Sequence, residues 1–406
     1  HKKRIEDNGF ECVMLDYLLD SDKQELRVKG LRFILECVIS AFTQEREQAF
    51  SRRAADWEKK IAELSPDRVY LDAQCALRTA LYHKLEIPVV LVETMPLSLY
   101  DPWVPPFTSG LIPKQTGISR LGIRLAWEKI VIARKIRNLF FSMLLCRQDY
   151  FSLYKRLFLE CGFPFEEKID WRRPFIIGIK ESKILSMNPS SLDFPRKYPP
   201  NCQYAPSRVD LNREDPMLNR RYARVMEEVC LQKQQRPDTK IIYCFSSTVM
   251  GFEKRSKIIF MKIRDICLRN PQFVFILSVG KYHNTSYLLP CPSNLYVFQQ
   301  VPQLHLLSYC DLMITSGGMN SIAECIEKEV PMLVCPLSLK SDQLGNSARV
   351  VYHGLGLRAR IKLDSSRTIE KRIVQLFENY ATFKRNLSMM RTKILAESTA
   401  INTEVI

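Results

Sequence analysis

This chain is predicted to fold as an α/β protein with two doubly wound domains that face a central cleft, and three observations lead to that prediction. Its 406 residues exceed what one hydrophobic core usually organises. Short apolar stretches of strand character alternate with stretches of helical periodicity, which is typical of parallel sheets. A polar run within 206–238 separates two such alternating halves. We therefore expect the ligand cleft at the carboxyl ends of the strands.

The first half starts with a helical stretch that ends at Asn8-Gly9. Apolar residues recur at helical spacing from residue 24 onward, and Ser65-Pro66 interrupts the helical pattern that follows. In chain order we predict a strand at 11–15, a helix within 24–62, a strand at 68–72, a helix at 76–85, a strand at 87–93, a loop at 96–113, and helices at 122–145 and 149–161.

Regular alternation resumes after the polar run. The predicted strands lie at 240–245, 273–279, 295–298, 311–315 and 331–335, with helices between them. The predicted boundaries are an N-terminal domain at 1–205, a linker at 206–238, a C-terminal domain at 239–390, and a final helix at 391–406 that can cross back to the first domain.

Composition excludes several classes of protein. Lysine and arginine number 60 against 44 acidic residues, a formal charge of +16, but the basic residues are scattered and no nucleic-acid-binding module accompanies them. The 13 cysteines contain no CxxC pair and the 5 histidines no HExxH motif, so we expect no metal site and reduced thiols in a cytoplasmic protein. The longest uncharged helical stretch has about nine residues, far below the roughly twenty that span a membrane, and no signal peptide is recognisable.

The most informative segment is 300–356. The predicted strand DLMIT runs into a Ser-Gly-Gly corner, and a helix follows that contains Asn320, Ser321 and Glu324. Glycine lacks a Cβ and lets the backbone approach a ligand closely. The start of the helix offers free N–H groups and a positive dipole end, which suit a diphosphate.

These residues resemble the C-terminal signature of the UDP-glycosyltransferase family, particularly its bacterial macrolide-type branch. The similar positions are Pro302, Gln303, Leu307, Asp311, Gly317, Gly318, Met319, Asn320, Ser321, Glu324, Val330, Pro331, Pro336, Asp342, Gln343, Asn346, Gly354 and Gly356. The resemblance implies a GT-B fold and metal-independent transfer from a UDP-sugar or dTDP-sugar, without a further cofactor.

The resemblance also implies a role for each residue around the corner. Backbone groups of Val301 pair with the uracil edge beside Gln303, and Glu324 accepts hydrogen bonds from the ribose hydroxyls. Asp342 and Gln343 hold the sugar, since a carboxylate and an amide supply acceptors and donors side by side. The diphosphate is held by the corner and its neighbours, Thr248, Ser316, Gly317, Gly318, Asn320 and Ser321.

In the N-terminal domain the resemblance places the acceptor site and the catalytic base. Asp72 matches the aspartate that orients this base, a histidine expected upstream of His1 together with the first strand. We interpret the sequence as an incomplete copy of a longer protein. The acceptor would be lined by 100–107 and 122–145. The basic and apolar helix at 122–145 is either an ordinary packing helix or a site of peripheral contact with anionic lipid.

Several of these residues have simpler interpretations. Ser321 and Glu324 have the spacing of a capping box, and Gln303 could belong only to a helix start. Asp342 and Gln343 could be an exposed loop pair. Two further residues, Thr248 and Asp72, could cap a turn and a helix respectively.

Three positions depart from the family pattern. Ser316 replaces a histidine that donates to the diphosphate, Ser247 replaces a glycine, and Gln300 replaces a tryptophan that stacks on uracil. A lost hydrogen bond to a charged group costs about 1.5–3 kcal/mol.

The expected activity is transfer of a hexose, with glucose as the expected sugar, to a hydroxyl of a small lipophilic acceptor, with inversion of the anomeric centre. The alternative is a non-catalytic nucleotide-sugar-binding protein of GT-B fold, which would explain the three departures and the missing base. A UDP-sugar epimerase of similar architecture fits less well, because it would not need Asp342 and Gln343 in this setting.

Overall fold

The computed structural model describes residues 2–13, 43–175, 177–197, 199–206, 209–213, 219–245, 253–280 and 284–399. Contacts divide the chain into two compact units. One unit comprises His1–Val92 and Trp127–Ile184, and the other comprises Glu93–Ala126 and Leu185–Ile406. The boundaries predicted at 1–205, 206–238 and 239–390 stay predictions, because contact density alone does not define a domain that folds independently.

The larger unit contains a six-stranded parallel sheet with the order β12-β11-β10-β7-β8-β9. Strands β7, β8 and β9 therefore follow one another toward one edge of the sheet, and β10, β11 and β12 follow one another toward the opposite edge. This is the doubly wound arrangement. The strands are β7 Lys240–Phe245, β8 Phe273–Ser278, β9 Leu295–Phe298, β10 Leu312–Thr315, β11 Met332–Val334 and β12 Gly356–Arg358. The direction of winding changes between β7 and β10, so the fold predicts a ligand site at their carboxyl ends.

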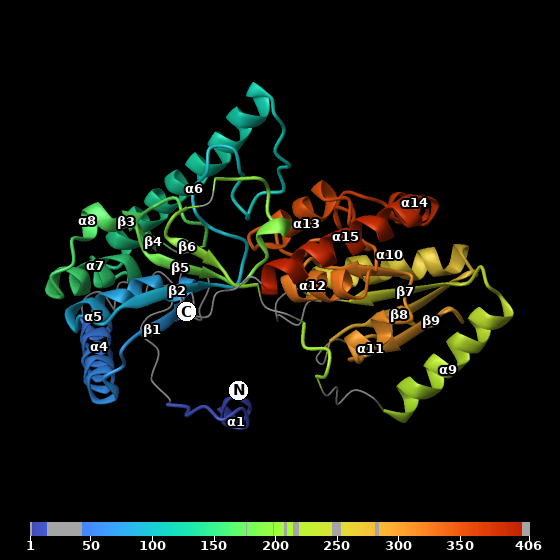
Figure 1. Cartoon of the computed structure of the whole chain (residues 1–406), viewed down its shortest axis with the longest axis horizontal. Coiled ribbons are helices and arrows are strands. Elements are labelled where there is room, and N and C mark those ends of the chain that lie inside the picture. Colours follow the sequence, from blue (N-terminus) through green and yellow to red (C-terminus); the bar gives the residue numbers. More distant parts are fainter. Residues whose placement is uncertain are drawn as a thin grey trace. The chain divides into compact units, whose positions relative to one another are not determined.

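Helices cover both faces of this sheet (Figure 1). They are α9 Arg220–Gln235, α10 Glu253–Arg269, α11 Gln303–Leu307, α12 Met319–Glu327, α13 Gln343–Tyr352, α14 Ser366–Glu378 and α15 Tyr380–Thr399, with 3₁₀ turns η2 Ser190–Leu192 and η3 Ser286–Leu288. Along β7, Ile241 and Tyr243 pack with α9, α11 and α12, whereas Ile242 and Cys244 pack with α10 and α14. Because successive side chains of a strand point to opposite faces of the sheet, β7 contributes alternate residues to two separate hydrophobic cores.

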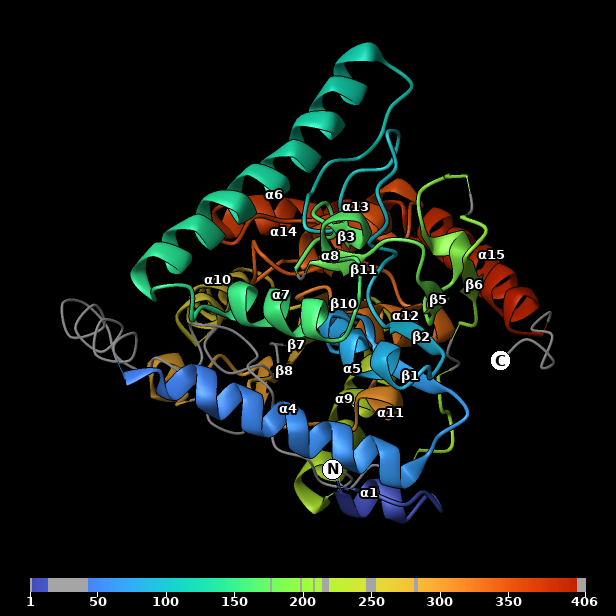
Figure 2. The ribbon, with the colours of Figure 1, turned by 90° about the vertical axis from the view of Figure 1, so that its left-hand side faces the viewer.

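A second sheet has the strand order β1-β2-β5-β6. Its strands are β1 Val69–Asp72, β2 Val89–Glu93, β5 Lys183–Ser186 and β6 Cys202–Tyr204, and a short antiparallel pair joins β3 Ile169–Asp170 to β4 Gly178–Ile179. The helices of this part of the chain are α1 Lys2–Glu6, α4 Glu45–Leu64, η1 Ala73–Arg78, α5 Thr79–Lys84, α6 Gly117–Leu144, α7 Tyr150–Glu160 and α8 Phe165–Lys168. Figure 2 shows helices α4 and α7 as ribbons. They pack through Phe50 and Tyr154, whose ring centroids are 5.1 Å apart.

The predicted strands at 240–245 and 295–298 are confirmed to the residue. The helix predicted at 76–85 is wrong in detail, because the segment starts as the 3₁₀ turn η1 at Ala73, with non-helical angles at Cys75, and α5 starts only at Thr79. No strand forms at 11–13, because no described strand pairs with these residues. Residues 14–42, which include the rest of this predicted strand, lie outside the described part of the chain.

The final helix, α15, begins at Tyr380 rather than at the predicted residue 391. The carboxylate of Glu397 near its end accepts hydrogen bonds from the backbone N–H groups of Ser190 and Ser191, both at 2.8 Å. These amides start η2 and have no carbonyl partner within that turn, so Glu397 anchors α15 to it.

A buried ionic cluster surrounds Asp193. One carboxylate oxygen, Oδ1, accepts hydrogen bonds from Arg349 Nε at 2.9 Å and Nη2 at 2.5 Å, and from the backbone N–H of Phe194 at 2.8 Å. Arg196 Nε lies 3.0 Å from the other oxygen. Burial alone would raise the pKa of Asp193, but the two guanidinium groups outweigh it, so the pKa lies below its ordinary 3.8. The stabilisation is therefore present above that value and is lost as pH falls through the folded-state pKa.

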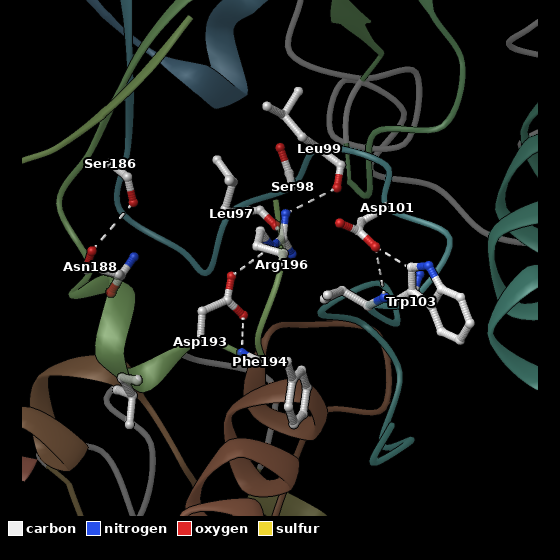
Figure 3. Close-up of polar contacts among 12 residues, drawn as sticks. Leu97, Ser98, Leu99, Asp101, Trp103, Ser186, Asn188, Asp193, Phe194 and Arg196 are labelled. Carbon is white, nitrogen blue, oxygen red and sulfur yellow. Dashed lines mark hydrogen bonds and ion pairs between the residues drawn. The ribbon is translucent and has the colours of Figure 1, made fainter. Parts of the chain in front are cut away.

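Arg196 connects this cluster to the loop at 97–99. Its guanidinium donates to the carbonyl oxygens of Leu99 at 3.3 Å and Leu97 at 3.5 Å, and Figure 3 shows it between that loop and Asp193. The loop continues into a turn in which Asp101 Oδ1 accepts from the N–H of Trp103 at 2.7 Å. The Asp193 carboxylate thus connects, through Arg349 and Arg196, segments that lie far apart in sequence.

His353 makes the stability of the same region depend on pH. Its Nε2 lies 3.1 Å from the carbonyl oxygens of both Leu192 and Asp193. Burial lowers its pKa below the ordinary 6.5. As pH falls through 6.5 the unfolded chain takes up a proton that the partly buried imidazole of the folded chain does not, so the free energy of unfolding should fall by up to about 1.4 kcal/mol per pH unit.

We expect His353→Gln to remove this loss between pH 7 and pH 5.5, because glutamine keeps an N–H donor but does not titrate. Denaturant unfolding at the two pH values measures the effect. The matched control is His83→Gln, at an exposed position on α5. Equal pH dependence in wild type and His353→Gln would contradict the prediction.

Candidate functional site

The Ser-Gly-Gly corner lies at the point where the winding of the large sheet changes direction. Strand β10 ends at Thr315, and α12 begins at Met319. Gly317 has φ +89, and a Cβ there would lie 2.7 Å from Val334 Cγ1, so the fold itself requires glycine. Gly318 has an ordinary φ of −67, and a Cβ there would meet nothing within 4 Å. The described protein thus leaves open space beside Gly318, where α12 starts.

The first turn of α12 has no side-chain cap, since Gly318 is its N-cap. The capping-box interpretation of Ser321 and Glu324 is therefore wrong, because Ser321 is the third helical residue rather than the cap. Asn320 is exposed, whereas Ser321 and Glu324 are buried. A ligand could therefore bind the N–H groups of this turn, which no side chain of the described residues caps.

Glu324 is the centre of a polar chain that joins α12, α11, β7 and the segment that contains Arg213. Gln303 Nε2 donates to Glu324 Oε2 at 2.7 Å, and the Tyr243 hydroxyl donates to Gln303 Oε1 at 3.0 Å. Arg213 Nη1 lies 3.0 Å from Glu324 Oε1. Gln303 therefore does more than start a helix. Sequence reasoning assigned no role to Tyr243, although strand alternation places it on this face, or to Arg213, which lies in a polar run without periodicity.

Asp342 and Gln343 lie at the start of α13, close to the corner. Gln343 is buried, and its Oε1 accepts hydrogen bonds from the N–H groups of Leu337 and Ser338, both at 2.8 Å. The interpretation as an exposed loop pair is therefore wrong for Gln343. Burial raises the pKa of Asp342 above its ordinary 3.8, although a hydrogen bond from Asn346 opposes this shift.

Asn346 connects the corner to this carboxylate. Its Nδ2 donates to the Gly317 carbonyl at 2.9 Å and to Asp342 Oδ2 at 2.8 Å. Its Oδ1 is buried without a hydrogen-bond partner among the described residues. The sequence pattern included Asn346 but assigned it no role; its position four residues after Asp342 on one helix was the available signal.

The remaining predicted residues lie as follows. Ser316 is buried beside the corner, and Val301 is buried in the core, which leaves only its backbone for a ligand. Asp72 is exposed and its Oδ1 accepts from the N–H of Gln74 at 2.8 Å, so it does cap η1 as its simpler interpretation predicts. Thr248 and Ser247 lie outside the described residues.

A cavity of about 540 Å³ opens next to the first turn of α12. Apolar side chains of α12 and α15 provide much of its wall, including Met319, Ala323, Ile326, Ile394 and Leu395, and Asn320 lies at its edge. Within the described ranges no group of three or more histidine, cysteine, aspartate or glutamate side chains could hold a metal ion. Among those residues no helix is long and apolar enough to cross a membrane.

Residues 284–396, which include most of this site, match the family model described as UDP-glucoronosyl and UDP-glucosyl transferase. This segment of the chain is therefore similar to the UDP-glycosyltransferase family. The resemblance predicted from the corner and its spacing is therefore confirmed.

Curated relatives are similar to about a quarter of the chain. NDP-glycosyltransferase YjiC of Bacillus subtilis (strain 168) is 37% identical over 98 residues, 24% of each chain. Zeaxanthin glucosyltransferase of Pantoea ananas is 34% identical over 101 residues, 25% of this chain and 22% of the relative. The alignment thus spans about a quarter of the length of these relatives.

The likeness in fold to solved structures extends over nearly the whole length of the chain. The glycosyltransferase of kitacinnamycin superposes with a TM-score of 0.59 at 17% identity, covering 98% of this chain and 85% of that one. The calicheamicin glycosyltransferase CalG4 gives 0.59 at 14% identity, covering 98% and 84%. The predicted α/β fold of GT-B type, with two Rossmann-like domains, is confirmed.

Proposed function

We propose that this protein transfers a hexose from a UDP-sugar to a hydroxyl of a small lipophilic acceptor. The observation that carries the proposal is the open corner at Gly318, at the amino end of α12, with Glu324 and Asn346 arranged around it. A diphosphate fits the N–H groups and positive dipole end of this helix. Curated relatives named as glycosyltransferases, one of them a zeaxanthin glucosyltransferase, support both the reaction class and an apolar acceptor.

The donor would lie along the carboxyl edge of the large sheet. We assign the nucleoside to the backbone of Val301 and to Gln303, and the ribose hydroxyls to Glu324. The sugar would contact Asp342 and the amide nitrogen of Gln343, because the Gln343 oxygen is already engaged. We assign the diphosphate to the corner and the residues beside it: Ser316, Gly317, Gly318, Asn320 and Ser321, with Thr248 as a further contact. Both UDP and dTDP suit this arrangement, and a solved relative, the spinosyn rhamnosyltransferase SpnG, has been complexed with thymidine diphosphate.

The reaction would proceed by one displacement with inversion. A general base oriented by Asp72 takes the proton of the acceptor hydroxyl, the acceptor oxygen forms a bond to C1 of the sugar, and the bond from C1 to the diphosphate breaks. The amides at the start of α12 stabilise the negative charge that develops on the diphosphate. The acceptor site predicted at 100–107 and 122–145 stays a prediction, and the apolar cavity beside Met319 and Asn320 is a further candidate for the lipophilic acceptor.

Donor binding and transfer can be tested separately. Calorimetric titration with UDP, dTDP and GDP should show binding of the first two and weak or no binding of GDP. Transfer is then measured with UDP-glucose and a panel of apolar alcohols. Binding without transfer would favour the alternative, a non-catalytic nucleotide-sugar-binding protein, for which Ser316 in place of a histidine is the specific observation. Absence of any nucleoside diphosphate binding would refute both.

Two finer features belong to the same proposal. We propose a cytoplasmic location, which suits the 13 cysteines without a CxxC pair. We also propose that the protein contacts membranes peripherally, at their surface.

Asn346 should position the sugar-binding carboxylate rather than touch the donor. Asn346→Ala removes the hydrogen bond to Asp342, so the pKa of Asp342 should rise further and the acidic limb of the kcat/KM profile should move to higher pH. Loss of one hydrogen bond to a charged group should also lower kcat/KM about tenfold or more. A pH profile with the UDP-sugar as varied substrate measures both effects.

The matched control is Asn294→Ala, because Asn294 is another asparagine whose amide donates to carbonyl oxygens, but far along the sheet from the corner. It should lower stability without moving the pH profile. An unmoved profile in Asn346→Ala would show that Asn346 is only structural.

A further inference from the structure

Helix α6 exposes a long apolar side. At about 1.5 Å per residue its 28 residues measure roughly 42 Å, and Figure 2 shows it as a long straight helix. One side is buried through Ile123, Trp127 and Phe141. The opposite side exposes eight large apolar residues, with exposed fractions from 55% to 87%: Ile118, Leu121, Leu125, Ile132, Ile136, Leu139, Phe140 and Met143.

These eight residues form one stripe, here called the α6 apolar stripe. They are separated by steps of mainly three, four or seven residues, so at 100° per residue they fall within about 100° of the helix circumference. Single exposed apolar residues are normal on protein surfaces, but a continuous stripe of this length marks an interaction site.

The charges on α6 indicate what this stripe contacts. The helix contains six basic residues and one acidic residue, Glu128, whose Oε1 lies 3.3 Å from Arg172 Nη2. Arg134 is buried and donates to the carbonyl oxygens of Trp171 and Arg173, both at 2.6 Å. The other five cations are exposed along the helix: Arg120, Arg124, Lys129, Lys135 and Arg137.

We propose that the α6 apolar stripe docks onto an anionic lipid surface. Cations beside an apolar helical face are the features of a helix that lies in the membrane interface, where the stripe enters the acyl boundary and the cations contact anionic headgroups. A second copy of this chain would bring the same cations and repel α6. A protein groove would need to match roughly 42 Å of stripe, whereas a bilayer needs no such match. The proposal does not depend on the proposed sugar transfer.

Vesicle co-sedimentation of the full chain tests the proposal. The probes are phosphatidylcholine vesicles and vesicles of equal parts phosphatidylcholine and phosphatidylglycerol. We expect binding to the anionic vesicles only, weakened by salt. Arg124→Gln with Lys135→Gln should weaken it by about fivefold for each cation removed, and Ile132→Ser with Ile136→Ser should weaken it at least as much.

Matched controls change the same residue types elsewhere. Lys371→Gln with Arg385→Gln removes two exposed cations, and Leu268→Ser with Val374→Ser removes two exposed apolar residues, outside α6. Both should bind vesicles as wild type does. Equal binding to neutral vesicles, or equal weakening by the controls, would overturn the proposal. A dimer that Ile132→Ser with Ile136→Ser dissociates, without vesicle binding, would assign the stripe to a second copy instead.

Discussion

Glu324→Ala is expected to weaken UDP binding about a hundredfold. The proposed ribose site depends on this buried carboxylate, and the loss of hydrogen bonds to a charged group costs about 1.5–3 kcal/mol each. The substitution also releases Gln303, which now donates to Glu324 Oε2. Calorimetric titration with UDP measures the change, and circular dichroism checks that the fold persists.

Arg213→Ala should act in the opposite direction. Its guanidinium lies where the ribose hydroxyls would bind, 3.0 Å from Glu324 Oε1, so the donor must displace it. The Arg213 side chain is 37% exposed, and such pairs contribute up to about 1 kcal/mol, so UDP affinity should rise by up to about fivefold. If Glu324→Ala leaves UDP affinity unchanged, the ribose assignment is wrong; if Arg213→Ala weakens binding, Arg213 is itself a donor contact.

Asp193→Asn is expected to lower the free energy of unfolding of the larger unit by about 3–5 kcal/mol. It leaves Arg349, whose side chain is 2% exposed, and Arg196 buried without a negative partner. Breaking a buried ion pair from one side costs about that much, because the remaining charge is not solvated. The midpoint of denaturant-induced unfolding measures the effect.

Two comparisons make this result specific. Arg349→Met should cost less than Asp193→Asn, because Asp193 keeps Arg196 as a partner. Glu63→Gln breaks an exposed ion pair with Lys60 and should leave the midpoint nearly unchanged. A midpoint shift in Asp193→Asn no larger than that of Glu63→Gln would show that the cluster contributes little to stability.

Much of the large sheet could be predicted because its signals are local. The apolar run at 240–245 and the short one at 295–298 identify strands without reference to the rest of the chain. The corner is local in the same sense, because a strand, two glycines and a helix start follow one another within a few residues. Gly317 proved to need its positive φ, whereas Gly318 only leaves space.

Other local signals were misleading. Ser321 and Glu324 have capping-box spacing, but the helix begins at Met319 with Gly318 as its N-cap, so both side chains contact other partners. The helix predicted at 76–85 has suitable periodicity, yet the backbone enters it through a kinked 3₁₀ turn capped by Asp72. Periodicity identifies a helix but not its first residue, which depends on the chain that precedes it.

The sequence by itself determined the order of β7 to β11 with the helices between them, and the family resemblance of the corner, since both depend on residues close together in the chain. Tertiary structure decided which side chains meet there. Tyr243 and Gln303 lie 60 residues apart, and Asp193 and Arg349 lie 156 apart. No local pattern pairs such residues, because their contact arises only when the folded chain brings distant segments together.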